Sequence, residues 1–192
     1  NLSLNSSGHN KEFDTNINEK TFINDLNYKS YNKINALGLT NNYEILLKNY
    51  NNKSQKSTTN KNKTENSLQS IINYEMKYPL QKIGEKFLST ITPTLSARYS
   101  PNKTKDKSQD DRIIDLNNIF SINRIGYSDT VEGGQSVTIG SEYALYNNKG
   151  NNKKLLTVNL ATALRDVENN RLPTNSTLGT VHDSILFVYT QI

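Results

Sequence analysis

Apolar and polar residues alternate along four segments of the chain, each of about ten residues, with the period of two expected of a β-strand. The segments are Gln69–Tyr78, Thr90–Tyr99, the stretch that follows Gln135 and ends at Tyr146, and Leu156–Arg165. Their apolar faces consist of Ile72, Tyr74, Met76 and Tyr78; of Ile91, Pro93, Leu95, Ala97 and Tyr99; of Val137, Ile139, Tyr143 and Leu145; and of Leu156, Val158, Leu160 and Leu164. We therefore expect four strands, each with two unlike faces.

The second face of each segment is too polar for a protein core and suits contact with water. It is made of Gln69, Asn73, Glu75 and Lys77; of Thr90, Thr92, Thr94, Ser96 and Arg98; of Ser136, Thr138, Gly140 and Glu142; and of Thr157, Asn159, Ala161, Ala163 and Arg165. A tilted strand needs about ten residues to cross the apolar layer of a membrane. The sequence therefore predicts an all-β fold, an antiparallel transmembrane β-barrel to which this chain contributes about eight to ten strands.

The composition favours a transmembrane barrel over a soluble domain. Only 33% of the residues are hydrophobic and the mean hydropathy is −0.74, which is too polar for a well-filled soluble core. In a barrel only alternate residues face lipid, and the others can be polar. We expect residues 1–192 to be an internal fragment of one barrel domain, because Asn1 is not a start residue, no signal peptide is visible, and Ile185–Ile192 stops within an apparent strand.

The rest of the chain predicts weaker strands and polar connections. Weak alternation predicts strands at Phe22–Tyr31 and Tyr43–Tyr50. The polar stretches predict a turn near Gly84, a tight hairpin turn at Asn147–Lys154 that Gly150 favours, and loops at Asn51–Asn66, Pro101–Asp111 and Asp166–Thr180. Short and long connections thus alternate, as they do on the two sides of an outer-membrane barrel.

Proline and tyrosine each modify this picture. Pro93 lies within a strong alternation although proline cannot donate to a sheet ladder, which predicts a bulge or a locally weakened pairing. Tyr78, Tyr99, Tyr143 and Tyr146 lie near strand ends, where an amphipathic ring can occupy the lipid headgroup level. Cross-strand packing in a soluble sheet is the alternative for these tyrosines, and the polarity of the opposite faces favours the membrane.

No motif indicates catalysis, a metal ion or a cofactor. His9 and His182 have no partner at metal-ligand spacing, cysteine is absent, and no nucleophile-elbow sequence accompanies His182 and Asp183. Phosphate-binding and dinucleotide-binding loops are also missing from the sequence. The net charge of +5 comes largely from lysines scattered among asparagines, which is typical of solvated loops rather than of a nucleic-acid interface. We therefore expect a protein that is not an enzyme and binds no nucleic acid.

The order of several residues between Thr90 and Tyr143 resembles one known family. A proline-bearing strand ends in Tyr-x-Pro at Tyr99–Pro101, a polar loop follows, and spaced loop residues precede a long strand. These residues are Ile119, Phe120, Asn123, Arg124, Gly126, Asp129 and Glu132. Together they resemble the C-terminal barrel of LptD, the lipopolysaccharide (LPS)-assembly outer-membrane family also called organic solvent tolerance protein. The resemblance is best over Leu68–Arg165.

The resemblance implies a translocon that assembles LPS into the outer leaflet of the outer membrane of a Gram-negative bacterium. The partners it implies are LPS, an LptE-type lipoprotein in the lumen, outer-membrane lipids, and an LptA-type periplasmic bridge that docks on an N-terminal β-jellyroll outside residues 1–192. The strands that form the family's lateral gate are also expected to lie outside this fragment. A general outer-membrane porin or channel, and a soluble β-rich adhesin-like binding domain, are the alternatives.

Under this interpretation the polar faces line a water-filled lumen. The expected lumen-facing contacts are Glu75, Lys77, Thr92, Thr94, Arg98, Glu142, Asn159 and Arg165. Two roles remain open for Arg98 and Arg165: charge-assisted contacts with anionic saccharide or phosphate, and lumenal salt bridges with Glu75 and Glu142, which we favour. We expect the marker residues Asn123, Arg124, Gly126, Asp129 and Glu132 to shape a loop on the barrel rim.

Overall fold

Ten β-strands make up the regular structure of the described residues. The computed structural model describes residues 1–13, 17–56, 63–148, 153–173 and 182–190, the last range by its backbone, and no helix occurs in these residues. The strands are β1 (Leu2–Glu12), β2 (Asn18–Lys29), β3 (Lys33–Ile34), β4 (Thr40–Gln55), β5 (Thr64–Lys77), β6 (Leu80–Ile83), β7 (Phe87–Ser100), β8 (Gly134–Asn147), β9 (Lys154–Arg165) and β10 (His182–Thr190).

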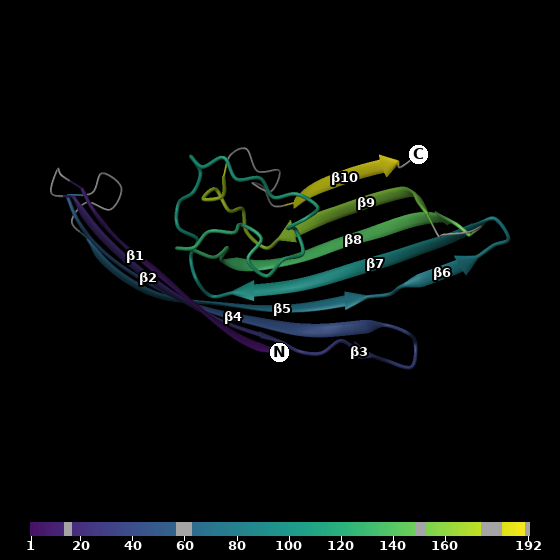
Figure 1. Ribbon diagram of the computed structural model, residues 1–192, viewed down its shortest axis with the longest axis horizontal. Helices are drawn as coiled ribbons and strands as arrows, with labels where there is room; N and C mark the ends of the chain where they lie inside the picture. Colours follow the sequence, from purple (N-terminus) through teal and green to yellow (C-terminus); the bar gives the residue numbers. More distant parts are fainter. Residues whose placement is uncertain (14–16, 57–62, 149–152, 174–181, 191–192) are drawn as a thin grey trace.

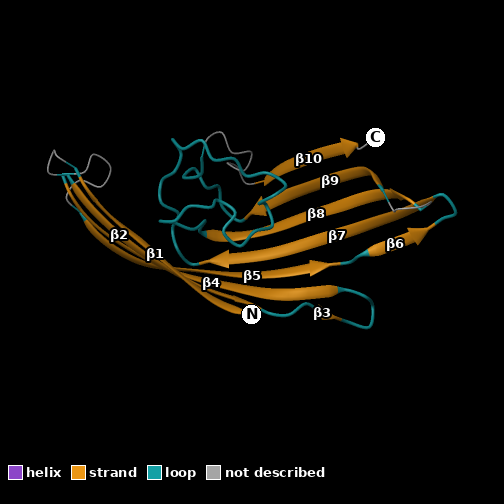
Figure 2. Cartoon of the chain, in the orientation of Figure 1, coloured by secondary structure: helices purple, strands orange, loops and turns teal. Residues whose placement is uncertain are grey.

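All ten strands belong to one antiparallel sheet with up-and-down topology (Figures 1 and 2). The order is β1-β2-β4-β5-β7-β8-β9-β10, while the short β3 pairs with β4 and the short β6 pairs with β7. The predicted all-β antiparallel fold is thus confirmed. The sheet is open: over the described residues β1 and β10 lie at its two edges and do not pair with each other.

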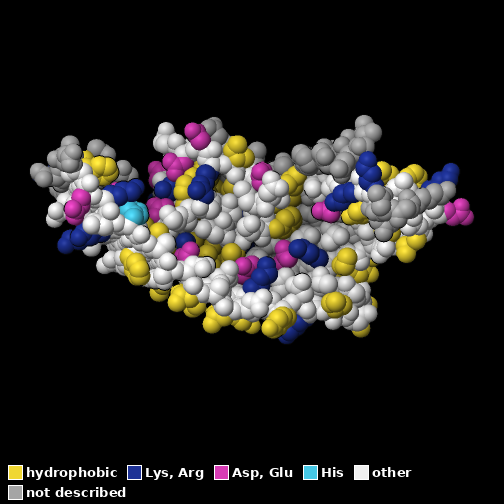
Figure 3. Space-filling view, viewed as in Figure 1, with side chains coloured by type: hydrophobic (Ala, Val, Ile, Leu, Met, Phe, Trp, Pro, Cys, Tyr) yellow, Lys and Arg dark blue, Asp and Glu magenta, His cyan; other side chains and the backbone are white. Residues whose placement is uncertain are grey.

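The two faces of the sheet reverse the usual distribution of polarity. One face carries hydrophobic side chains in adjacent register, such as Leu95 opposite Ile139 and Val137 opposite Leu164; Leu95 is half-buried, whereas the other three are exposed, Ile139 and Leu164 each by 44%. The other face carries polar side chains that are buried, such as Asn73 and Thr138, each 3% exposed. We call these the outer and the inner face. Figure 3 shows the inner side, with hydrophobic side chains along the lower edge.

The connection between β7 and β8, residues 101–133, covers part of the inner face and provides half of the buried residues of the two apolar clusters. In Figure 1 this loop lies across β7, β8 and β9. Ile114, Ile119 and Ile125 pack with Ala161, Ala163 and Leu172 in one cluster, and Ile122 and Val131 pack with Leu46 and Ile71 in another. The loop therefore buries apolar residues on a face that is otherwise polar.

The first third of the chain is more regular than its sequence indicates. The prediction of a loop at Asn51–Asn66 is wrong at both of its ends, because β4 continues to Gln55 and β5 begins at Thr64, and residues 57–62 of that stretch lie outside the described residues. Polar side chains replace apolar packing there: Asn52 is 3% exposed and donates a hydrogen bond to Thr21 Oγ1 at 2.8 Å. The strand β1 was not predicted, since its side chains are exposed and show no regular apolar face. β1 and the ends of β4 and β5 are held by backbone hydrogen bonds in long hairpins. Such pairing leaves no pattern of hydrophobic residues in the sequence.

Pro93 lies in β7 opposite the gap between β5 and β6, on the edge of β7 that does not pair with β8. Its pairing with Ser141 continues the register of β7 with β8 without a shift. On the other side β7 pairs with β5 up to Lys77 and then with β6 from Leu80, and Tyr78 N–H donates to the Pro93 carbonyl between them. The interruption is therefore in the neighbouring strand, where the missing proline N–H is tolerated.

The predicted turns and tyrosines are located as follows. Gly84 lies in the tight turn between β6 and β7 and donates to the Phe87 carbonyl. By their register Tyr99 and Tyr143 are on the outer face, whereas Tyr146 follows a register shift in β8 and lies under the Lys154 ammonium. Gly150 lies outside the described residues.

Candidate functional site

The loop of residues 101–133 is shaped by local hydrogen bonds before it contacts the sheet. The Asp115 carboxylate accepts from the Asn117 N–H, and the Ile119 N–H donates to the Asp115 carbonyl, which closes a helical turn. Gly126 adopts a φ of +64°, a conformation that favours glycine, and its carbonyl accepts from Arg112. These turns place Ile119, Ile122 and Ile125 on the side of the loop that faces the sheet.

Gly140 in β8 makes room for the loop. A Cβ at this position would lie 2.7 Å from Phe120 Cζ and 2.7 Å from the Leu160 carbonyl oxygen. The Phe120 ring therefore rests where any other residue would project. Gly133 has a comparable role at the end of the loop, because a Cβ there would overlap the Asn102 carbonyl. Both glycines permit a close approach between the loop and its surroundings.

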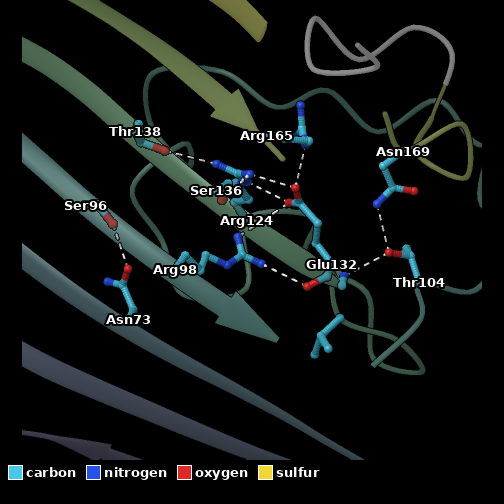
Figure 4. A network of polar contacts seen from close by, with 12 residues as sticks. Asn73, Ser96, Arg98, Thr104, Arg124, Glu132, Ser136, Thr138, Arg165 and Asn169 are labelled. Atoms are coloured by element: carbon cyan, nitrogen blue, oxygen red, sulfur yellow. Dashed lines mark hydrogen bonds and ion pairs between the residues drawn. The ribbon is translucent and has the colours of Figure 1, made fainter. Parts of the chain in front are cut away.

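Three arginines converge on Glu132 beneath the loop (Figure 4). Arg124 binds the Glu132 carboxylate in a bidentate manner, with Nε and Nη2 each donating at 2.6 Å. Arg165 Nε donates to Glu132 Oε1 at 2.9 Å, and Arg98 Nη1 donates to Oε2 at 3.5 Å. Arg124 also donates to Thr138 and Ser136 of β8, both at 3.1 Å. We call these four charged residues the Glu132 cluster.

The register of the sheet brings two of these arginines to the same place. Arg98 in β7 pairs with Ser136 in β8, and Ser136 pairs with Arg165 in β9, so the three side chains form one row across the inner face. The loop supplies the other two members, Arg124 and Glu132, from above this row. The cluster thus joins three strands to the loop.

The cluster is buried and carries an excess of positive charge. Each of the three arginines and Glu132 is at most 8% exposed. Burial by itself raises the pKa of the Glu132 carboxyl, but the charges of Arg124, Arg98 and Arg165 and the Arg124 hydrogen bonds outweigh it and hold this pKa far below its usual range. Glu132 is therefore ionised at neutral pH, and three cations face one anion.

A second set of polar contacts holds the far side of the loop on β4 and β5. Gln69 accepts from the Val131 N–H at 2.8 Å and donates to the Asp129 carbonyl at 3.1 Å. Lys105 bridges Glu65 at 2.9 Å and Asp129 at 3.5 Å, and its ammonium lies over the Tyr50 ring. The loop is therefore tied to four long strands, β5, β7, β8 and β9, with a further contact to β4.

Two pockets lie where the loop leaves the inner face uncovered. The larger, of about 590 Å³, is lined by Leu116, Asn117 and Phe120 of the loop and by Thr92, Thr94 and Asn159 of the strands, among others. The smaller, of about 300 Å³, shares Asn117 and Phe120 with it and extends over Asn42 and Asn73. Since they share these two residues, we treat them as one groove beside the loop.

All eight polar residues predicted to face the lumen lie on the inner face. Lys77, Thr92, Thr94, Glu142 and Asn159 line the larger pocket, Glu75 lines the smaller one, and Arg98 and Arg165 belong to the Glu132 cluster. The partners predicted for the two arginines differ from those found. Both pair with Glu132, whereas Glu75 pairs with Lys77 at 3.0 Å and Glu142 approaches Lys154 at 3.9 Å.

The five marker residues lie within one loop, and each has a contact of its own. Asn123 donates to the Tyr127 carbonyl, Arg124 and Glu132 form the centre of the cluster, Gly126 takes the positive φ, and Asp129 pairs with Lys105 and Lys107. The loop lies on the inner face of the sheet rather than only at its rim. Sequence reasoning missed this, although Leu116, Ile119, Ile122 and Ile125 recur every three residues, a spacing that indicates a buried side.

Comparison with known families identifies the chain. The family model described as LptD: LPS transport system D matches residues 11–185. The chain belongs to the LptD family. The match includes the loop, the Glu132 cluster and the groove, as well as most of the sheet. No curated protein sequence matches the chain.

Membership of the LptD family connects the chain to LPS transport and assembly. Within the described ranges, no group of His, Cys, Asp or Glu has the arrangement of a metal site. The same part of the chain also contains no helix long and apolar enough to cross a membrane. The polar groups of the inner face are neutral hydrogen-bonding side chains and charged side chains of both signs, which suit contact with water and with polar molecules.

Proposed function

We propose that this chain is a stretch of the wall of an LptD-type outer-membrane β-barrel that assembles LPS into the outer leaflet of a Gram-negative outer membrane. The outer face contacts lipid, and the inner face with its loop borders the lumen. The observation that carries the proposal is the reversal of polarity: the exposed face is apolar and the covered face is polar. A sheet in water would have the opposite arrangement.

The size of the strands supports the same role. β7 and β8 each have 14 residues and β9 has 12, which exceeds the roughly 9–11 residues that a tilted strand needs to cross a membrane. The open edges at β1 and β10 suit continuation of the sheet by further strands of the same barrel. We therefore propose that residues 1–192 belong to one barrel domain.

The partners follow from this role. We propose an LptE-type lipoprotein in the lumen, beside the loop, and an LptA-type periplasmic bridge that supplies LPS through an N-terminal domain of the complete protein. The inner face supplies neutral hydrogen-bonding groups and no reacting group is required of it, because transport needs a closed wall and a polar path.

The experiment uses cells in which the full-length protein is depleted and replaced by plasmid-borne copies. LPS at the cell surface is quantified by labelling intact cells. We expect the wild-type copy to restore surface LPS and the empty plasmid to leave LPS inside the cell. Restored ion conductance without any change in surface LPS would instead assign the chain to a porin.

A second measurement tests which face meets lipid. A photoreactive side chain is placed at Ile139 on the outer face or at Thr94 on the inner face of the full-length protein in native membranes. We expect crosslinks to phospholipid from position 139 and none from position 94. Equal crosslinking from both positions, or a full-length protein that folds in water without detergent, would refute the membrane wall and favour a soluble adhesin-like domain.

A further inference from the structure

The groove beside the loop has the size and lining of a ligand site. Its larger pocket measures about 590 Å³, within the range of roughly 300–1,000 Å³ typical of small-molecule sites. It is continuous with the smaller pocket of about 300 Å³ at Asn117 and Phe120. We propose that this groove binds uncharged sugar residues of the transported glycolipid and disfavours its phosphorylated part. The proposal rests on the proposed LPS transport and adds to it the chemical class of the bound segment.

The lining combines the two kinds of surface that a sugar ring presents. A pyranose exposes C–H groups on its faces and hydroxyl groups around its edge. Phe120 and Leu116 provide apolar surface from the loop. Thr92 and Thr94 of β7 and Asn159 of β9 provide hydroxyl and amide groups, which can both donate and accept hydrogen bonds. A sugar hydroxyl also donates and accepts, so neutral side chains of this kind match it.

The aromatic side chain is held in place before any ligand arrives. Phe120 rests on Gly140, where a Cβ would lie 2.7 Å from its Cζ, and it packs against the cluster formed by Ile114, Ile119 and Ile125. Asn117 is fixed as well, because its amide donates to the Asp115 carboxylate at 3.1 Å. A site with fixed side chains loses less conformational freedom on binding than a mobile one.

The charge of the groove favours binding of neutral sugars over binding of phosphorylated ones. The charged residues that line the two pockets are Lys29 and Lys77 against Glu44, Glu75, Asp115 and Glu142, two positive charges against four negative. Both lysines pair with a carboxylate of the groove, at 3.5 Å for Lys29 and 3.0 Å for Lys77. Of the two carboxylates in excess, Asp115 and Glu142, the latter approaches Lys154 at 3.9 Å, which is not among the lining residues. The net negative charge of the lining therefore disfavours a phosphate and leaves a neutral sugar unaffected.

The arginines that would attract a phosphate are not available to it. Arg98, Arg124 and Arg165 lie under the loop and are each at most 8% exposed. All three form ion pairs with Glu132 of the loop itself. The sequence-based alternative of an anionic substrate held by Arg98 and Arg165 is therefore disfavoured, and the accessible part of the same face has the opposite charge.

The test measures binding to the full-length protein, purified in detergent, with two probes. One probe is a neutral trisaccharide of glucose, and the other is the same trisaccharide with one 6-phosphate; saturation-transfer NMR gives the affinity of each. We expect the wild-type protein to bind the neutral probe at least about tenfold more tightly than the phosphorylated one. Asn159→Ala should weaken binding of the neutral probe about two- to tenfold.

A charge reversal makes the test specific to the groove. Glu142 has a side chain that is 53% exposed, so Glu142→Lys changes the charge of the groove without removing a buried contact. We expect this variant to bind the phosphorylated probe about tenfold more tightly than the wild type does. Glu85→Lys makes the same change of charge at an exposed position in the turn between β6 and β7, away from the groove, and should leave both affinities unchanged.

Three results would overturn the proposal: no binding of the neutral probe, wild-type binding of the phosphorylated probe as tight as that of the neutral one, or equal effects of Glu142→Lys and Glu85→Lys. The surface-LPS measurement on wild-type cells judges the proposed function separately. Normal export together with any of these three results would remove the sugar groove and leave the transport role in place.

Discussion

Replacing Glu132 with glutamine tests whether the Glu132 cluster holds the loop on the sheet. Glutamine keeps the shape of the side chain and removes its charge, so three guanidinium groups, each at most 8% exposed, lose their shared counter-ion. Removing one partner of a buried ion pair costs about 3–5 kcal/mol. Since every 1.4 kcal/mol is a factor of ten, the population of undocked loop should rise by a factor of about 100 to 3,000.

Amide hydrogen exchange of residues 119–133, followed by mass spectrometry on the full-length protein, measures this population. We expect Glu132→Gln to accelerate exchange in this stretch by two to three orders of magnitude or so, with little change in β2. Glu142→Gln is the matched control, because its side chain is 53% exposed and its nearest cation lies at 3.9 Å, so it should cost no more than about 1 kcal/mol. Equal exchange in the two variants would show that apolar packing alone holds the loop.

The remaining predictions address pH, packing and membrane insertion. The pKa of Glu132 in the folded protein lies below its ordinary 4.5, so its ionised carboxylate stabilises the docked loop fully above that value, and this stabilisation is lost as the pH falls through the lower folded pKa. Protection of the loop amides should therefore stay constant from about pH 8 to about pH 5 and fall only in stronger acid. Glu132→Gln should show no such loss of protection in acid. Gly140→Ala should displace the phenylalanine ring above it at a cost of about 1–3 kcal/mol and accelerate loop exchange, whereas Ser141→Ala should not. Ile91→Arg on the outer face should reduce the fraction of protein that folds into lipid vesicles, at a cost of up to about 2–4 kcal/mol, and the adjacent Thr92→Arg on the inner face should insert normally; equal insertion would contradict the assignment of the faces.

Hydrophobic alternation predicted the sheet where one face has regular apolar residues. In β7 and β8 the residues Leu95, Ala97, Val137 and Ile139 alternate with polar ones, and the predicted Thr90–Tyr99 lies within the observed Phe87–Ser100. The method fails where strands have two polar faces. The ends of β4 and β5 and all of β1 are held by backbone pairing and by polar contacts such as that of Asn52, which leave no periodic hydrophobic signal.

The sequence identified the important residues of the loop, but it did not predict where the loop lies on the sheet. Asn123, Arg124, Gly126, Asp129 and Glu132 were recognised as a set, and their order carried the family resemblance. Their contacts depend on the sheet, because Arg98 and Arg165 meet Glu132 only after three strands have paired in register. A sequence gives the distance between two charges along the chain, and a cluster of this kind depends on distances in space.

The loop divides the inner face into regions of opposite charge. Beneath it, three arginines share one glutamate; in the groove beside it, four carboxylates face two lysines. If the loop only filled space, it would not need to bring its own carboxylate to a row of arginines. Under the proposed transport role, a polyanionic glycolipid that passes along this face with the loop docked would meet excess carboxylates, which do not retain its phosphates. With the loop undocked, Arg98 of β7 and Arg165 of β9 would be exposed on either side of Ser136 in β8, where both could donate to a phosphate. Under the same proposed role, the Glu132 cluster would therefore do more than fasten the loop, since it would also keep the two arginines from binding the phosphates of the passing glycolipid.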